Sequence, residues 1–73
     1  MKRTFVCIDP SVNAKKHWSV ETDSNPFFAE FTWGRIGEAS QALRKHYPNV
    51  QALNYAVAQK IREKKNKGYV EIA

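Results

Sequence analysis

The chain has 73 residues, and 12 Lys and Arg against 7 Asp and Glu give it a formal net charge of +5. A chain this short buries only about 60% of the surface that its unfolded form exposes, and its core supplies only about 3–5 kcal/mol of net stability. We therefore expect one domain, residues 1–73, that binds a partner at its surface, and a deep catalytic cleft is excluded. The basic balance favours a polyanion: nucleic acid before an acidic protein or a membrane.

Positive charge is concentrated in the second half of the chain. Residues 1–35 hold five Lys and Arg against four Asp and Glu, whereas residues 36–73 hold seven against three. We expect the basic surface to come mainly from the second half.

Cys7 is the only cysteine, so an intramolecular disulfide is excluded, and one cysteine with two histidines is a poor set of metal ligands. We expect a reducing, intracellular location, cytoplasmic or associated with the nucleoid. The apolar run from Phe5 to Ile8 is too short for a signal peptide, and no segment approaches transmembrane length. We expect no cofactor, no metal and no membrane contact.

Three alternating stretches predict strands over residues 4–9, 15–22 and 27–35. Polar turns at 9–13 and 22–26 join them into two successive hairpins. The first strand is apolar on both faces, which predicts that it is central in the sheet or covered on both sides. In the second, Trp18 and Val20 share a face and are expected in the core. Residues 27–35 form the most apolar run and are predicted to be the central strand, with Phe27, Ala29, Phe31 and Trp33 on one side.

The second half predicts a strand, a helix and a short edge strand. Residues 40–46 are expected as a fourth strand, although Gln-Ala-Leu-Arg-Lys also has helix propensity. Asn49 is a good N-cap for a helix over about 49–66, in which Val50, Leu53, Val57 and Ile61 form one apolar stripe. Gly68 is a plausible helix stop, and residues 69–72 alternate like an edge strand. The predicted fold is α+β, a single antiparallel sheet of four to five strands with one helix packed on it.

The end of the third strand is the candidate functional corner. Trp33 and Arg35 stand two residues apart next to Gly34 and Gly37, where an aromatic ring and a guanidinium can stack and hydrogen-bond at one spot. By spacing alone Trp33 also suits the core, and Arg35 could bond a carboxylate as well as a phosphate. A basic cluster lies at the end of the predicted helix. Its members are Lys60, Arg62, Lys64, Lys65 and Lys67. They suit the negative end of the helix dipole or a phosphate backbone.

Taken together, these residues resemble the WGR domain family over about residues 4–72. The motifs that carry the resemblance are Asn13 to Trp18, Trp33 to Gly37, Gln41, Ala52 in the helix, and Glu63 to Tyr69. The family implies a small sheet-and-helix fold and nucleic-acid binding. In eukaryotic poly(ADP-ribose) polymerases such domains help to recognise DNA breaks, and in bacteria they also occur alone or fused to other domains. The chain looks like the free-standing, bacterial kind.

By motif position, the resemblance implies that Trp33 stacks on a sugar or base at a DNA end. It implies that Arg35 contacts the phosphate backbone or a neighbouring domain, and that Tyr69 lies near a terminal phosphate. The candidate nucleic-acid-binding residues are Trp33, Arg35, Lys64, Lys65, Lys67, Tyr69, Asn13, Lys16 and Gln41. For several of them a structural role stays open: a turn for Asn13, protection of a strand edge for Lys16, and packing for Tyr69.

Two positions depart from the family pattern. His17 stands where the family prefers a large aromatic, and Ala39-Ser40 replaces a segment that usually carries glycine before Gln41. Packing of the second strand and the shape of the following loop depend on these positions.

The favoured function is a non-enzymatic module that binds duplex DNA or DNA ends, with RNA as a possible ligand. Paired carboxylates, a nucleophile with its base, and a phosphate-cradling glycine loop are all missing from the sequence, so we expect no enzyme activity. The alternative is a protein–protein interaction module that docks a partner through Arg35, Tyr55 and other exposed aromatics, because Trp, Tyr and Arg dominate interface hot spots.

Overall fold

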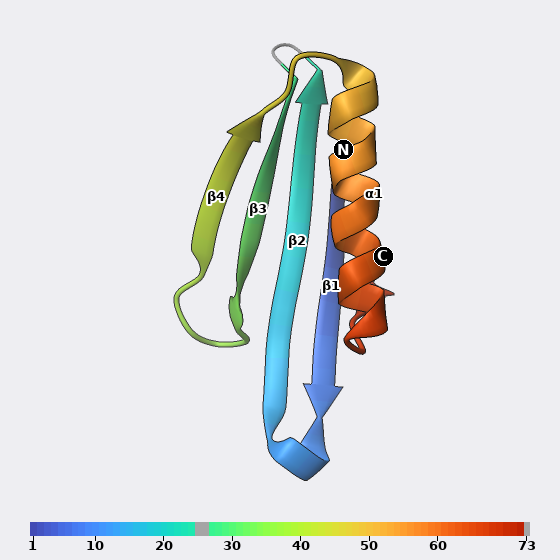
Figure 1. Ribbon diagram of the computed structural model, residues 1–73. Coiled ribbons are helices and arrows are strands. Elements are labelled where there is room, and N and C mark those ends of the chain that lie inside the picture. Colours follow the sequence, from blue (N-terminus) through green and yellow to red (C-terminus); the bar gives the residue numbers. More distant parts are fainter. Residues whose placement is uncertain (25–26, 73) are drawn as a thin grey trace.

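A computed structural model describes residues 1–24 and 27–72, and in them it contains one antiparallel sheet and one long helix. The elements are β1 (Lys2–Asp9), a 3₁₀ turn (Pro10–Val12), β2 (Ala14–Ser24), β3 (Phe27–Arg35), β4 (Gln41–His46), α1 (Val50–Asn66) and β5 (Val70–Ile72). The strand order is β4-β3-β2-β1-β5, and α1 packs on one face of this sheet (Figure 1). The predicted α+β fold is confirmed. Residues 25–26 of the second predicted turn lie outside the described residues.

Register across the sheet sets the position of each side chain. Phe5 pairs with Trp18, Trp18 pairs with Trp33, and Trp33 pairs with Gln41, so these residues form one row across four strands. Because strand side chains alternate between faces, residues of this row lie on the same side of the sheet. We call this side, on which α1 packs, the helix face, and the other side the opposite face.

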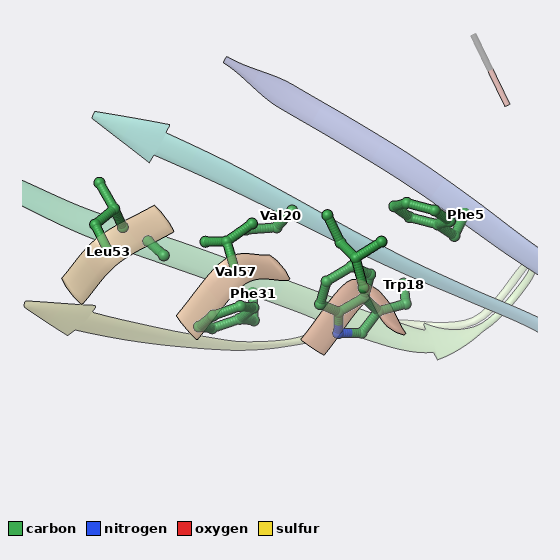
Figure 2. Packing of buried hydrophobic residues seen from close by; sticks show 8 residues of the cluster. Phe5, Trp18, Val20, Phe31, Leu53 and Val57 are labelled. Carbon is green, nitrogen blue, oxygen red and sulfur yellow. The ribbon is translucent and has the colours of Figure 1, made fainter. Parts of the chain in front are cut away.

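The core lies between α1 and the helix face. Its fully buried hydrophobic members among the described residues are Phe5, Trp18, Val20, Ala29, Phe31, Leu53, Val57 and Ile61. The ring of Trp18 lies 5.5 Å from that of Phe5 and 5.9 Å from that of Phe31 between centroids, and Figure 2 shows these rings beside the helix residues. The prediction that Trp18 and Val20 share a face and lie in the core is confirmed.

One prediction about the sheet is wrong, and another holds only in part. The central strand is β2 rather than residues 27–35, because β5 adds a strand beyond β1. β1 lies inside the sheet, between β2 and β5, but it is covered on one face only: Phe5 is buried, whereas Ile8 on the opposite face is 62% exposed. One helix can cover only one side of a sheet, so the apolar residues of the opposite face stay open.

Both ends of α1 are capped as the sequence predicts. The Asn49 side chain accepts a hydrogen bond from the Ala52 amide at 2.8 Å. At the other end Gly68 has a φ of 95°, which glycine adopts at little cost, and the amides of Gly68 and Tyr69 donate to the carbonyls of Lys65 and Lys64. The buried stripe starts at Leu53, since Val50 in the first turn is 41% exposed.

An ion pair joins β5 to β1. The Arg3 guanidinium donates to both carboxylate oxygens of Glu71, at 2.7 and 2.6 Å. This bidentate bond raises the pKa of Arg3 and lowers the pKa of Glu71. The short strand after the helix is therefore held where Tyr69, the residue before it, lies beside the end of α1.

Candidate nucleic-acid interface

Two adjoining depressions lie on the helix face, beside α1. The large groove, of about 590 Å³, lies between α1 and strands β3 and β4, and is lined by Trp18, Phe31, Trp33, Leu43, Lys45, Tyr47, Tyr55, Ala56, Gln59, Lys60, Glu63, Lys64 and Lys67. The small hollow, of about 250 Å³, is lined by Lys16, Trp33, Gly34, Arg35, Lys64 and Tyr69. Trp33 and Lys64 line both, so the two depressions are continuous at these side chains.

Trp33 is half-buried at the boundary between them. Its ring packs against the core next to Trp18, its partner on β2, and it also lines both depressions. The alternation of β3 directs the indole to the helix face, while the strand ends two residues later at Arg35. The indole is therefore fixed by the core on one side and open to a ligand on the other.

Arg35 is held at the turn but stays accessible. Its guanidinium lies 3.3 Å from a carboxylate oxygen of Glu38, and it donates to the Asn13 carbonyl oxygen at 3.3 Å. The side chains of Arg35 and Glu38 are 43% and 66% exposed. An ion pair this exposed contributes little, so the guanidinium can exchange its partner for a phosphate at small cost.

The backbone conformation at position 34 favours glycine, because L side chains rarely adopt its positive φ. The residue has a φ of 155°, and a Cβ there would lie 3.4 Å from the Ala39 carbonyl oxygen and from the Ser40 Cα atom. The two positions that depart from the family pattern meet here, since Ser40 Oγ lies 3.0 Å from His17 Nε2. The polar side chains at these positions therefore join β2 to the loop before β4.

Lys64 lies between aromatic rings and other lysines. Its ammonium lies 5.3 Å from the ring centroid of Tyr69 and 6.0 Å from that of Trp18. Burial lowers its pKa most, and repulsion from Lys67, Lys60 and Lys16 lowers it further, partly offset by attraction to Glu63. Burial also raises the pKa of the Tyr69 hydroxyl. A bound anion would relieve the repulsion at this point.

The positive charge of the two depressions is largely unneutralised. Within residues 1–24 and 27–72, no carboxylate lies within 4.0 Å of the amino groups of Lys16, Lys45, Lys64 or Lys67, and the only acid in either lining is Glu63, which pairs with Lys60 at 3.8 Å. These residues form no cluster of three or more potential metal ligands. None of the helices in the same stretches has the length and apolar character to cross a lipid bilayer.

The structure brings together part of the predicted set. Lys16, Trp33, Arg35, Lys64 and Tyr69 line the small hollow, and Lys67 lines the large groove. Asn13 supports Arg35 from the end of the 3₁₀ turn, where its φ of 54° is left-handed. Lys65 is exposed on the helix, and Gln41 lies opposite Trp33 on β4; both are outside the two linings.

The sequence reasoning did not select Lys45 or Tyr47 as site residues. Both line the large groove, although neither belongs to the family motifs. Lys45 stands two residues after Leu43 on β4, so both side chains lie on the same face of the sheet. Leu43 pairs with the buried Phe31, and this register between β3 and β4 places Lys45 on the helix face. That register was the missing signal.

Comparisons with known proteins identify the architecture. The family model of the WGR domain matches residues 1–73. A crystal structure of a protein from Bacteroides fragilis is similar, with 30% sequence identity, a TM-score of 0.87 and coverage of the whole of this chain. The chain spans 20% of the length of that protein. A search of curated proteins with the sequence of this chain finds no significant match.

Proposed function

The chain belongs to the WGR domain family, which suggests nucleic-acid binding, and from this premise we propose that it is a non-enzymatic module that binds duplex DNA at its ends. The small hollow would receive the end of the duplex. Lys65 in the last turn of α1 and Lys67 at its C-cap would approach the phosphate backbone beyond the small hollow.

The single observation that carries this proposal is the composition of the small hollow. Lys16, Arg35 and Lys64 supply three cations there, with two half-buried aromatic residues, Trp33 and Tyr69, and no acid in the lining. Cations bind phosphate oxygens and fix the position of a nucleic acid without reading its sequence. An aromatic face accepts any base, which adds about 1–3 kcal/mol per stacked base.

A preference for ends follows from the position of the indole. Inside a duplex each base is covered by its neighbours, whereas a terminal base pair leaves one face free. Trp33 can stack only on such a free face, because its own ring is fixed against the core. The cations around it would then hold the phosphates next to the end.

Fluorescence anisotropy with a labelled blunt duplex, a closed circular competitor and an RNA duplex, at two salt concentrations, tests the proposal. Trp33→Ala should weaken binding of the blunt duplex by about 1–3 kcal/mol and barely change competition by the circle. Phe28→Ala is the matched control, since this half-buried aromatic lies on the same strand but faces away from the helix. Absence of binding to every duplex at low salt would end the proposal.

A second candidate function, docking of a partner protein, rests on the opposite face. Ile8, Val70 and Ile72 are 62%, 65% and 45% exposed there, on adjacent strands. Exposed apolar groups of this kind are typical of protein interfaces. Retention of a partner after nuclease treatment, lost in Val70→Asp but kept in Trp33→Ala, would support this function over the first.

A further inference from the structure

We propose that the large groove binds an unpaired nucleic-acid strand that continues from the duplex end, so that the domain prefers ends with a single-stranded overhang. This inference rests on the proposed function of the small hollow and extends it to a second, adjoining site. Its basis is the lining of the groove, the charges on its two walls and its continuity with the hollow.

Aromatic side chains on both sides of the groove offer stacking surfaces. Trp33 and Tyr47 are half-buried and pack against the core, so their rings are fixed. On the helix wall Tyr55 is 69% exposed, and its hydroxyl accepts a hydrogen bond from the Gln59 amide at 2.6 Å. Fixed aromatic faces along a path are what proteins use to bind unpaired bases irrespective of sequence.

Cations stand on both walls of the groove. Lys45 comes from β4, Lys60 and Lys64 come from α1, and Lys67 caps the C-terminal end of α1. Lys60, Lys64 and Lys67 recur about once per helical turn along the chain. A row of cations beside a row of rings complements a chain that alternates phosphates with bases, and this repeat favours a nucleic-acid strand over an acidic peptide.

Continuity gives the groove its relation to the duplex end. Trp33 and Lys64 line both depressions, so a strand that leaves a duplex held in the small hollow enters the groove directly. The volume of about 590 Å³ lies within the range of about 300–1,000 Å³ that ligand sites in proteins occupy. The groove therefore has room for a short unpaired stretch.

The test compares a blunt duplex with duplexes that carry five unpaired thymidines at the 5′ or the 3′ end. Wild-type protein should bind one of the overhang duplexes at least about 5-fold more tightly than the blunt duplex. Lys45→Gln and Tyr55→Ala should each remove most of this gain, and should weaken binding of the overhang duplex more than binding of the blunt duplex. Lys45→Gln should also lower the salt dependence for the overhang duplex by about 0.7 in log–log slope.

Arg44→Gln is the matched control. Arg44 precedes Lys45 on β4, carries the same charge and faces the other side, where it lies over Phe28 and 3.6 Å from Glu30. This variant should keep the overhang gain. Circular dichroism of all three variants should show the wild-type fold, because each substituted side chain is exposed.

The outcomes separate this inference from the proposed function. Equal binding of blunt and overhang duplexes, or a gain that survives both Lys45→Gln and Tyr55→Ala, overturns the groove proposal and leaves the duplex proposal standing. Binding of single-stranded oligothymidine that depends on Lys45, without any blunt-duplex binding, overturns the duplex proposal and supports the groove. Displacement of the overhang by polyglutamate at equal charge concentration also counts against a nucleic-acid groove.

Discussion

Two cation–ring contacts on opposite faces of the sheet differ in how their charge is neutralised. On the opposite face the Arg44 guanidinium lies 4.3 Å from the Phe28 ring centroid, and Glu30 neutralises it at 3.6 Å. On the helix face Lys64 lies 5.3 Å from the Tyr69 ring centroid, and other lysines are its main charged neighbours. The first arrangement is closed by its own acid, whereas the second leaves a positive field that an external anion can neutralise.

The helix creates this difference. Because α1 covers only part of the helix face, its lysines stand beside the exposed ends of β3 and β4 and leave two depressions between them. The opposite face has no covering element among the described residues, and there Arg44 of β4 pairs with Glu30 of the neighbouring β3. Binding and stability therefore should respond to substitutions on the two faces in different ways.

The largest expected effect is on stability. Trp18 and His17 are neighbours on β2 that point to opposite faces, and Trp18 is only 3% exposed. Trp18→Ala should cost about 3–5 kcal/mol, which equals the whole expected stability and leaves the chain largely unfolded. His17→Ala removes the hydrogen bond to Ser40 and should cost about 0.5–1.5 kcal/mol. Urea unfolding followed by circular dichroism measures both, and similar losses would contradict the one-sided core.

The next effect is on the salt dependence of duplex binding. Lys16→Gln with Lys64→Gln removes two cations of the small hollow, so the log–log slope should fall by about 1.8 if each contacts one phosphate. Lys2→Gln with Arg44→Gln removes the same charge from the opposite face and should change the slope little. Anisotropy titrations between about 50 and 200 mM salt compare the two double variants. At about 100 mM salt the Debye length is about 10 Å, so only charges close to the bound phosphates affect the slope strongly. Equal slopes would mean that net charge alone drives binding.

A smaller expected effect is a loss of stability without a loss of duplex affinity, when the N-cap of α1 is removed. Asn49→Ala removes the side chain that caps α1 at the Ala52 amide and should destabilise the domain by about 1 kcal/mol. At temperatures where the variant is folded, its duplex affinity should match the wild type, since no interface charge changes. Thermal unfolding and anisotropy on the same preparation check both statements. A large loss of affinity in the folded variant would show that the helix start takes part in binding.

The smallest expected effect is a pH dependence of binding. The pKa of Lys64 is lowered in the free protein, chiefly by burial and then by neighbouring lysines. A bound phosphate favours the charged form and raises this pKa, so binding takes up a proton and affinity falls as pH rises through the free pKa. Duplex titrations on the alkaline side should show this decline in the wild type and less of it in Lys64→Arg. An identical decline in the two proteins would assign the effect to another group.

Alternation and caps were enough to predict the elements of the fold. The bounds of β3, the start of α1 at its Asn49 cap and the stop at Gly68 follow from local sequence, because each depends on residues within a few positions of one another. Strand order could not be derived in the same way. The position of β5 beside β1 depends on pairing between residues almost seventy positions apart, such as Arg3 with Glu71, and no local pattern encodes that.

The residues of the candidate site also differ in whether local sequence or strand register places them there. Trp33 and Arg35 could be selected because they share one strand end, and Lys64 and Tyr69 because they flank one helix stop. Lys45 could not, since its place in the groove depends on the register of β4 against β3. The contact between His17 and Ser40 was equally out of reach, because it joins two positions that each look like isolated departures from the family pattern.

The most direct test of the central claim is a chemical-shift map of the ¹⁵N-labelled domain with a blunt DNA duplex at low salt. We expect the signals of the Trp33 indole N–H and of the amides around Lys16, Arg35, Lys64 and Tyr69 to shift on titration, while those of Glu30 and Arg44 stay in place. Shifts confined to the opposite face, or none at saturating duplex, would contradict this claim.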